Sequence, residues 1–315
     1  MEWREGLEGE VGELTEVPDV PELPGGEVRV GVEGLLGPID ASMARFVRTV
    51  GQLTDGQVRS PSLVPPWTRG HVITHVARAA DSLCRLLEGA RTGEEIPQYA
   101  NMAARDAEIE AGAGRPVAAL LDDVAASAAR LDTAVRTLPE AAWQRRVRLR
   151  TGELRTPDSL LATRLRELEV HHADLAAGYT FADIPERLAR WIIEDIAAAV
   201  SRRADAPSLR IEATEGSGLV VEVGPSPGSG GGGGGAAEDG SVEGGSGEGG
   251  SVGGSVAGGL VSGGSVVGGS VVGGGRVVVR GGPADLLGWL TGRSKDGAGL
   301  TSPGGGAVPV APYWI

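Results

Sequence analysis

The chain has 315 residues, of which 53 are glycine and only 3% are aromatic, so part of it cannot belong to a packed core. The length allows one large domain or two smaller ones. Ten of the 42 acidic residues lie in residues 1–37, opposed by Arg4 and Arg29, so this segment supplies −8 of the −13 net charge. The remainder carries no strong basic excess, which argues against a nucleic-acid partner. Without an apolar run of about 20 residues or a basic leader, we expect a cytoplasmic protein with no membrane partner.

Helix start and stop signals predict five amphipathic helices that form a bundle over residues 39–204. Residues 1–38 have no sustained period, and we expect a disordered acidic tail there. Residues 97–114 are expected to be a polar connection that holds Arg105, and the basic run at 145–150 a solvated turn. The helices are expected at residues 40–53, 68–89, 116–138, 156–178 and 185–203.

The pattern changes to alternation after residue 205, which predicts a small α/β domain over residues 205–315. Strands are expected at 209–214, 219–223 and 276–280, followed by a helix that Pro283 opens and Gly292 stops. Residues 224–275 contain 25 glycines in 52 positions, with recurring SVVGG and SVGG units. We expect a flexible insertion there, because such a composition offers few side chains to bury; an array of glycine-rich strands is the alternative.

The helix expected at 156–178 carries two stripes. One stripe is apolar, and the other holds Arg164, Glu167, His171 and Asp174. Glu167 and His171, four residues apart, point the same way, so they could share a metal ion, pair with each other or face water. On this helix alone a solvated face is the ordinary interpretation. A third ligand from elsewhere would favour the metal site.

Candidate partners lie on the helix expected at 68–89. His75 shares the apolar side with Val72 and Ala79, which is ordinarily the position of a core histidine, and His71 precedes it by one turn. Cys84 is the only cysteine and lies on the opposite side from His75, so we expect a small buried residue and no disulfide. Two histidines and one glutamate would make an open catalytic metal site, best suited to zinc, with other divalent metals as alternatives.

Four segments together resemble the mycothiol-dependent maleylpyruvate isomerase family: WTRGHVITHVARAADSL, ARDAEIEAGAGRP, RLRELEVHHADL and LLGWLTGRS. The resemblance covers residues 40–223 and 276–315. It implies a DinB-like metal-binding helical bundle followed by a small mixed α/β C-terminal domain. It also implies the metal ligands His75, Glu167 and His171, which selects His75 over His71 and His171 over His172. Family arginines fall on Arg105 and Arg293, where they would bind the carboxylates of a dicarboxylate substrate.

The activity implied by the resemblance is cis–trans isomerisation of maleylpyruvate to fumarylpyruvate, in gentisate-type aromatic breakdown. A zinc-activated thiolate adds to the double bond, the bond rotates, and elimination releases the product. The thiol would be mycothiol rather than Cys84, and we expect a monomer. Two alternatives are a mycothiol S-transferase that acts on electrophiles, and a non-catalytic metal-binding regulatory module with the acidic tail as its partner-binding element. The insertion at 224–275 could misplace Arg293 if it disturbed the strand pairing.

Overall fold

The computed structural model describes residues 32–214, 216, 218–224, 276–294 and 296–311. The chain divides into two units, of which one comprises Met1–Gly224 with Val277–Ile315 and the other Pro225–Arg276. Every helix and strand given below belongs to the first unit. Residues 1–31 of the predicted acidic tail and residues 225–275 of the predicted insertion lie outside the described residues.

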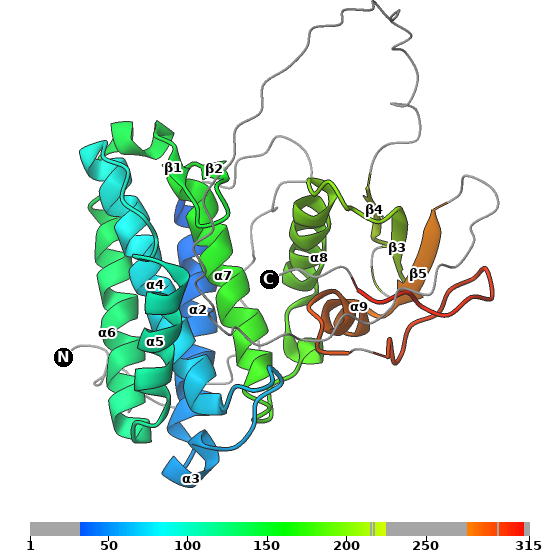
Figure 1. Cartoon of the computed structure of the whole chain (residues 1–315), viewed down its shortest axis with the longest axis horizontal. Coiled ribbons are helices and arrows are strands. Elements are labelled where there is room, and N and C mark those ends of the chain that lie inside the picture. Colours follow the sequence, from blue (N-terminus) through cyan, green and yellow to red (C-terminus); the bar gives the residue numbers. More distant parts are fainter. Residues whose placement is uncertain (1–31, 215, 217, 225–275, 295, 312–315) are drawn as a thin grey trace, which may run out of the picture. The chain divides into compact units, whose positions relative to one another are not determined.

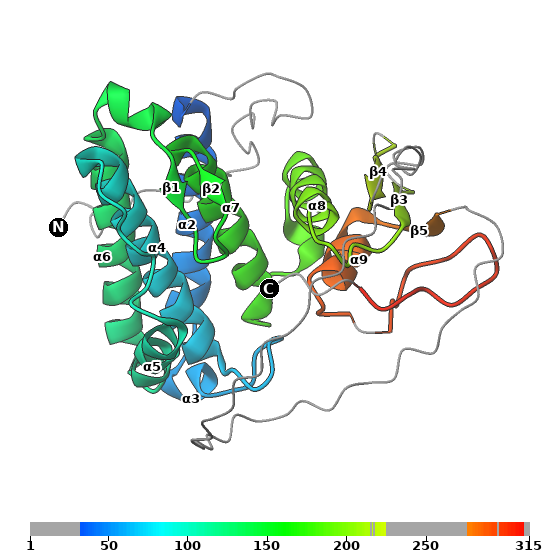
Figure 2. The same cartoon turned by 45° about the horizontal axis from the view of Figure 1, so that its top comes forward.

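Amphipathic helices dominate the described part of the chain, as the sequence predicts, and a small mixed sheet accompanies them. Helices α2, α4, α6 and α7 lie side by side, and α5 packs against α4 (Figures 1 and 2). Two short 3₁₀ helices at Glu140–Gln144 and Phe181–Asp183 join longer elements. The α-helices are α2 (Val32–Gly51), α3 (Asp55–Val58), α4 (Arg69–Thr92), α5 (Met102–Ala113), α6 (Val117–Arg136), α7 (Pro157–Asp174), α8 (Glu186–Ser201) and α9 (Pro283–Leu290).

The three predicted strands of the C-terminal part are present as β3 (Leu209–Ala213), β4 (Val220–Val223) and β5 (Val277–Gly281). Their order is β4-β3-β5, with β4 antiparallel and β5 parallel to β3. Helix α8, predicted as the last helix of the bundle, contacts α9 and β4. The mostly helical fold with a small mixed sheet therefore confirms the predicted fold class. Within the described residues, no helix combines the length and the apolar character that crossing a membrane requires.

Helix α2 begins at Val32, eight residues before the predicted start at Asp40, and Pro38 lies inside it. Leu35 is buried and Leu36 packs against the same apolar cluster. Their burial outweighs the single backbone hydrogen bond that a proline cannot donate. The predicted boundary was wrong because residues 32–38 show too little period on their own to reveal what they pack against.

Helix α4 ends at Thr92, and Gly93 rather than the predicted Gly89 closes it in a left-handed conformation, with φ of 82°. Gly89 is instead helical and buried. A Cβ there would lie 2.8 Å from the carbonyl oxygen of Glu94. The glycine at 89 therefore permits a close approach of the returning chain, which a sequence pattern does not distinguish from a helix stop.

The predicted polar connection at 97–114 contains helix α5. Asn101 caps this helix by accepting a hydrogen bond from the Ala104 backbone N–H at 2.8 Å. Ile109 and Ala113 are buried and α5 packs against α4, so tertiary packing stabilises a segment whose own apolar face is narrow. The basic run at 145–150 contributes the short strand β1 (Val147–Arg148), which pairs with β2 (Leu154–Arg155), rather than a simple turn.

Helix α7 ends at Asp174, four residues before the predicted stop at Gly178. The carbonyl oxygens of Leu175 and Ala176 accept hydrogen bonds from the Arg69 guanidinium at 2.6 and 2.7 Å. A side chain from α4 thus satisfies carbonyls just beyond the helix end, and the chain turns away early.

Candidate metal centre

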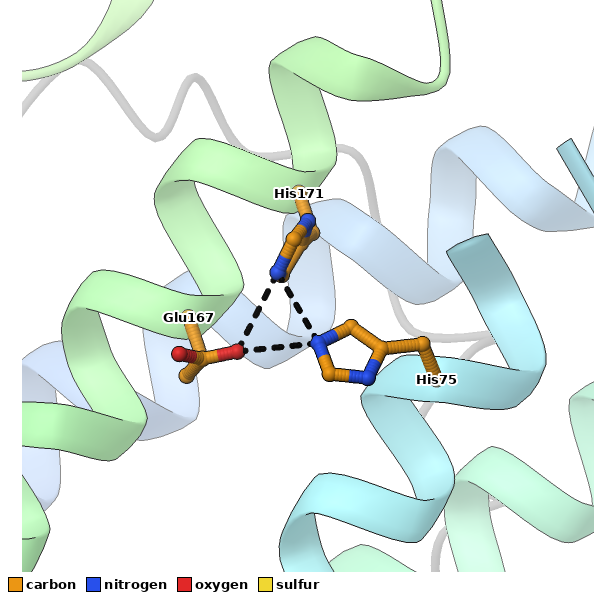
Figure 3. Close-up of side chains that lie close together, drawn as sticks. All are labelled: His75, Glu167 and His171. Carbon is orange, nitrogen blue, oxygen red and sulfur yellow. Dashed lines mark hydrogen bonds and ion pairs between the residues drawn. The ribbon is translucent and has the colours of Figure 1, made fainter. Parts of the chain in front are cut away.

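Helices α4 and α7 bring His75, Glu167 and His171 together with their donor atoms facing one another (Figure 3). The Nε2 atoms of the two histidines are 3.0 Å apart. The Oε2 atom of Glu167 lies 3.2 Å from Nε2 of His75 and 3.1 Å from Nε2 of His171. Of all His, Cys, Asp and Glu residues in the described ranges, these form the one group with metal-ligand spacing.

The three donors fit a metal ion such as zinc. Ligands about 2.0–2.1 Å from a tetrahedral zinc ion lie about 3.3 Å from each other, close to the separations observed. The Glu167 side chain is 16% exposed and that of His171 is 5% exposed, so the ordinary interpretation of this stripe as a solvated face is wrong. Helix α4 covers that face of α7. The two-histidine, one-carboxylate set leaves a coordination position for a small ligand.

Electrostatics distribute the protons unequally over the triad. Burial, reinforced by His171, lowers the pKa of His75 to about 4. Burial also acts to lower the pKa of His171, but Asp174 and Glu167 outweigh it and raise that pKa to about 9. Burial acts to raise the pKa of Glu167, yet hydrogen bonds from both histidines hold it well below 4.5. At neutral pH without metal, His75 is therefore neutral and His171 carries one additional proton as an imidazolium, which a metal ion would displace.

A second layer of polar side chains surrounds the triad. Nδ1 of His171 lies 2.8 Å from Oδ2 of Asp174, which is fully buried and belongs to the same helix. The Arg293 guanidinium, just beyond α9, donates to both Asp174 oxygens at 2.9 and 2.7 Å. Arg164, which is 1% exposed, donates to the carbonyl oxygen of Val76 at 2.8 Å and so ties α7 to α4.

Arg105 reaches the triad from α5. Its Nη2 lies 3.4 Å from Nδ1 of His75, and its guanidinium lies 5.8 Å from the ring centre of Trp67 and 5.9 Å from that of Tyr99. Trp67 also borders the His75 ring, at 5.4 Å between centres. Arg105 therefore lies beside the triad, between the aromatic side chains of Trp67 and Tyr99, which carry no separate signal in the sequence.

A cavity of about 1540 Å³ opens onto the triad. Arg105, Arg293 and Trp67 lie in its wall beside the three donors. Further along, the wall holds charged side chains of both signs from α7 and α8, among them Arg166 and Asp195, which form an ion pair. The cavity therefore has room for more than one small molecule next to the triad.

The remaining candidates lie apart from the triad. His71 contacts Thr68 and, through Nε2, Glu110 at 2.9 Å. His172 bonds to Thr49 at 2.7 Å and stacks on Tyr179, on another side of α7.

Fold and site together define a helical-bundle protein with a three-donor candidate metal centre.

The comparisons agree with that class. Residues 39–176 match the family model described as the mycothiol maleylpyruvate isomerase N-terminal domain. The chain is similar to the crystal structures of the mycothiol-dependent maleylpyruvate isomerase and of a histidine-to-alanine mutant of it. Each match has a TM-score of 0.69 and 28% identity, and covers 90% of this chain and 97% of the other. Among curated proteins, none matches this chain in sequence.

Residues 39–176 therefore carry the N-terminal domain that this family model describes. The resemblance predicted from the four sequence motifs is therefore confirmed.

Proposed function

We propose that this protein is a mycothiol-dependent isomerase that converts maleylpyruvate to fumarylpyruvate. The triad of His75, Glu167 and His171 carries the proposal, because its three donors have metal-ligand spacing and lie in the wall of a cavity. The match of residues 39–176 to the family's N-terminal domain and the likeness to an isomerase structure at 28% identity support it. We also propose that the protein acts in the cytoplasm as a monomer and that its metal is zinc rather than another divalent ion.

The chain's own residues divide the work of the reaction. His75, Glu167 and His171 would hold the metal, which when bound supplies a Lewis acid that keeps a coordinated thiol deprotonated near neutral pH. Arg105 would bind a substrate carboxylate, because its guanidinium borders the triad in the cavity wall. Held there, it also stabilises the negative charge that develops on the substrate as sulfur adds.

The bond changes balance without an oxidant or a further reactant. The thiolate forms a carbon–sulfur bond at one carbon of the cis double bond, and the π electrons move into the conjugated carbonyl as an enolate. The former double bond is now single and rotates. Reversal of the electron flow breaks the carbon–sulfur bond, restores the double bond in the trans form and returns the thiolate.

A mycothiol S-transferase is the second candidate, and one observation favours it. A dicarboxylate was expected to use both Arg105 and Arg293, but the Arg293 guanidinium is already paired with Asp174. An electrophile without carboxylates needs neither arginine. Both candidates use the same metal and the same thiol, so they differ only in the second substrate.

The test is an absorbance time course of maleylpyruvate conversion by the metal-loaded protein, with mycothiol and in parallel with glutathione. We expect conversion with mycothiol only. His75→Ala should lose both metal and turnover, whereas His71→Ala, one turn away on α4 and outside the triad, is the matched control and should keep both. Absence of conversion by metal-loaded protein would overturn the isomerase. If the protein then consumed mycothiol together with a haloaromatic electrophile, it would be the transferase. If it consumed no mycothiol in either assay, the non-catalytic module would be the remaining candidate.

A further inference from the structure

We propose that Asp174 and Arg293 are positioning residues that hold His171 in the tautomer and orientation needed to bind metal. The inference rests on the proposed metal site and not on the identity of the reaction. It assigns Arg293 a different role from the substrate contact that the sequence motif implied. Two observations carry it: the hydrogen bond between His171 and Asp174, and the paired contact of Arg293 with Asp174.

The first observation concerns the proton on His171. Nδ1 of this ring lies 2.8 Å from Oδ2 of Asp174, and an ionised carboxylate can only accept. The proton of the neutral ring must therefore stay on Nδ1, which leaves the lone pair on Nε2. That nitrogen faces Glu167 and His75 (Figure 3). When a metal ion binds, His171 therefore loses the proton on Nε2 and keeps the one on Nδ1.

His75 provides the contrast. Its Nδ1 lies 3.4 Å from Nη2 of Arg105, and a guanidinium only donates. A donor at that position favours the tautomer whose proton is on Nε2, on the side of the triad. Asp174 therefore favours the tautomer of His171 in which Nε2 can bind a metal ion, whereas Arg105 does not favour that tautomer in His75.

The second observation is the way Asp174 itself is held. Its side chain is fully buried, and an isolated carboxylate there would be costly. Arg293 donates from Nε to one oxygen and from Nη2 to the other, the two-point geometry that fixes a carboxylate in plane. Its Nη1 donates to the Thr291 carbonyl oxygen. The Nε and Nη2 donors of Arg293, which could bind a substrate carboxylate, are therefore occupied by Asp174.

The position of Arg293 depends on a turn after α9. Gly292 has φ of 76°, and the Arg293 backbone N–H donates to the Gly288 carbonyl oxygen at 2.8 Å. Arg293 lies 119 positions after Asp174 in the chain. The C-terminal segment thereby completes a metal site whose ligands all come from α4 and α7.

The experiment measures zinc affinity by competition with a chelating dye, without thiol or substrate. We expect Asp174→Asn and Arg293→Ala to bind zinc about 10–100-fold more weakly than the wild type, in the range found for outer partners of metal ligands. Arg293→Lys keeps the charge but cannot donate to both carboxylate oxygens in the same two-point geometry. Its zinc affinity should therefore lie between that of the wild type and that of Arg293→Ala. Asp123→Asn is the matched control, because it breaks the part-buried pair with Arg78 between α4 and α6 and should leave zinc affinity unchanged.

A second readout separates positioning from a general loss of structure. Nitrogen NMR of the metal-free protein, at a pH above the His171 pKa of about 9, should show the His171 proton on Nδ1 in the wild type and in Arg293→Lys, and partly on Nε2 in Asp174→Asn. Wild-type zinc affinity in both Asp174→Asn and Arg293→Ala would overturn the inference. A raised KM in Arg293→Ala with unchanged zinc affinity would show instead that Arg293 binds the substrate. If the wild-type protein binds no zinc, the proposed metal site itself fails, whereas missing isomerase activity with bound zinc leaves the inference standing.

Discussion

Cys84 lies partly buried on α4, and burial, with the nearby Asp81 charge, raises the pKa of its thiol to about 11 from 9.0. Because only the thiolate reacts, this shift lowers the reactive fraction near pH 7.5 by about 100-fold. We expect iodoacetamide to modify Cys84 slowly, at a rate that rises about tenfold per pH unit until the pH approaches 11. Mass spectrometry of samples quenched at intervals measures that rate.

The same residue tests where the reacting thiol comes from. Since Cys84 is the only cysteine, Cys84→Ser removes every protein thiol. We expect mycothiol-dependent turnover to stay within about twofold of the wild type, because a serine of similar size suits a partly buried position. Rapid alkylation at neutral pH, or loss of turnover in a folded Cys84→Ser variant, would mean that the protein supplies its own nucleophile.

At the scale of elements, α4 and α5 approach each other closely where Gly70 faces the end of α5. A Cβ at Gly70 would lie 2.0 Å from the Ala113 carbonyl oxygen. We expect Gly70→Ala to lower the free energy of unfolding by about 1–3 kcal/mol, because backbone must move to admit the methyl group. Urea unfolding followed by circular dichroism measures the change.

Gly114→Ala is the control for that prediction. Gly114 follows α5 with φ of −87°, and a Cβ there would meet nothing within 4 Å. We expect its unfolding free energy to lie within about 0.5 kcal/mol of the wild type. Equal losses in the two variants would show that α4 and α5 do not meet in the way described.

Each helix of the bundle shows how far local signals reach. Pro157 at the first turn and the Leu161, Leu165 and Leu168 stripe predicted the start and the buried face of α7 correctly, because caps and 3.6-residue spacing act within a few turns. Helix α5 was missed, because its stability comes from packing on α4 rather than from its own apolar face.

For the whole molecule, the register of the sheet shows how far apart the strands on either side of residues 225–275 lie. Val223 in β4 and Val277 in β5 both pair with Leu209, on opposite sides of β3. With strands about 4.8 Å apart, these two residues are about 10 Å from each other. A linker of about six residues, which reaches about 20 Å when extended, is therefore long enough to join them.

We expect replacement of residues 225–275 by a six-residue Gly/Ser linker to leave zinc affinity and mycothiol-dependent turnover unchanged. The free energy of unfolding should stay the same or rise by up to about 2 kcal/mol. The reason is that the entropic cost of closing a flexible connection falls by about 0.6 kcal/mol each time its length is halved. Thermal unfolding and the zinc competition assay measure the two effects. A folded variant that no longer binds zinc would show that these residues contribute to the site.

Within the site, the sequence could predict pairs that lie on one helix. Glu167 and His171 are four residues apart and must share a face, and His75 was placed on the core side of its own helix by its apolar neighbours. The family resemblance joined these residues into one triad and selected His75 over His71. Asp174 is in the same stripe, three residues after His171, but its spacing gave no sign that it would also bind Arg293.

Short-range spacing and motifs specify the helices with strong caps and periodicity, the three strands and the resemblance to the isomerase, so these features could be predicted from the sequence. Tertiary structure alone decided that the Glu167 face is buried against α4 rather than solvated. It also decided that Arg293 meets Asp174 across 119 positions of chain. Contacts between distant segments depend on how whole elements pack, and no local period or charge pattern specifies them.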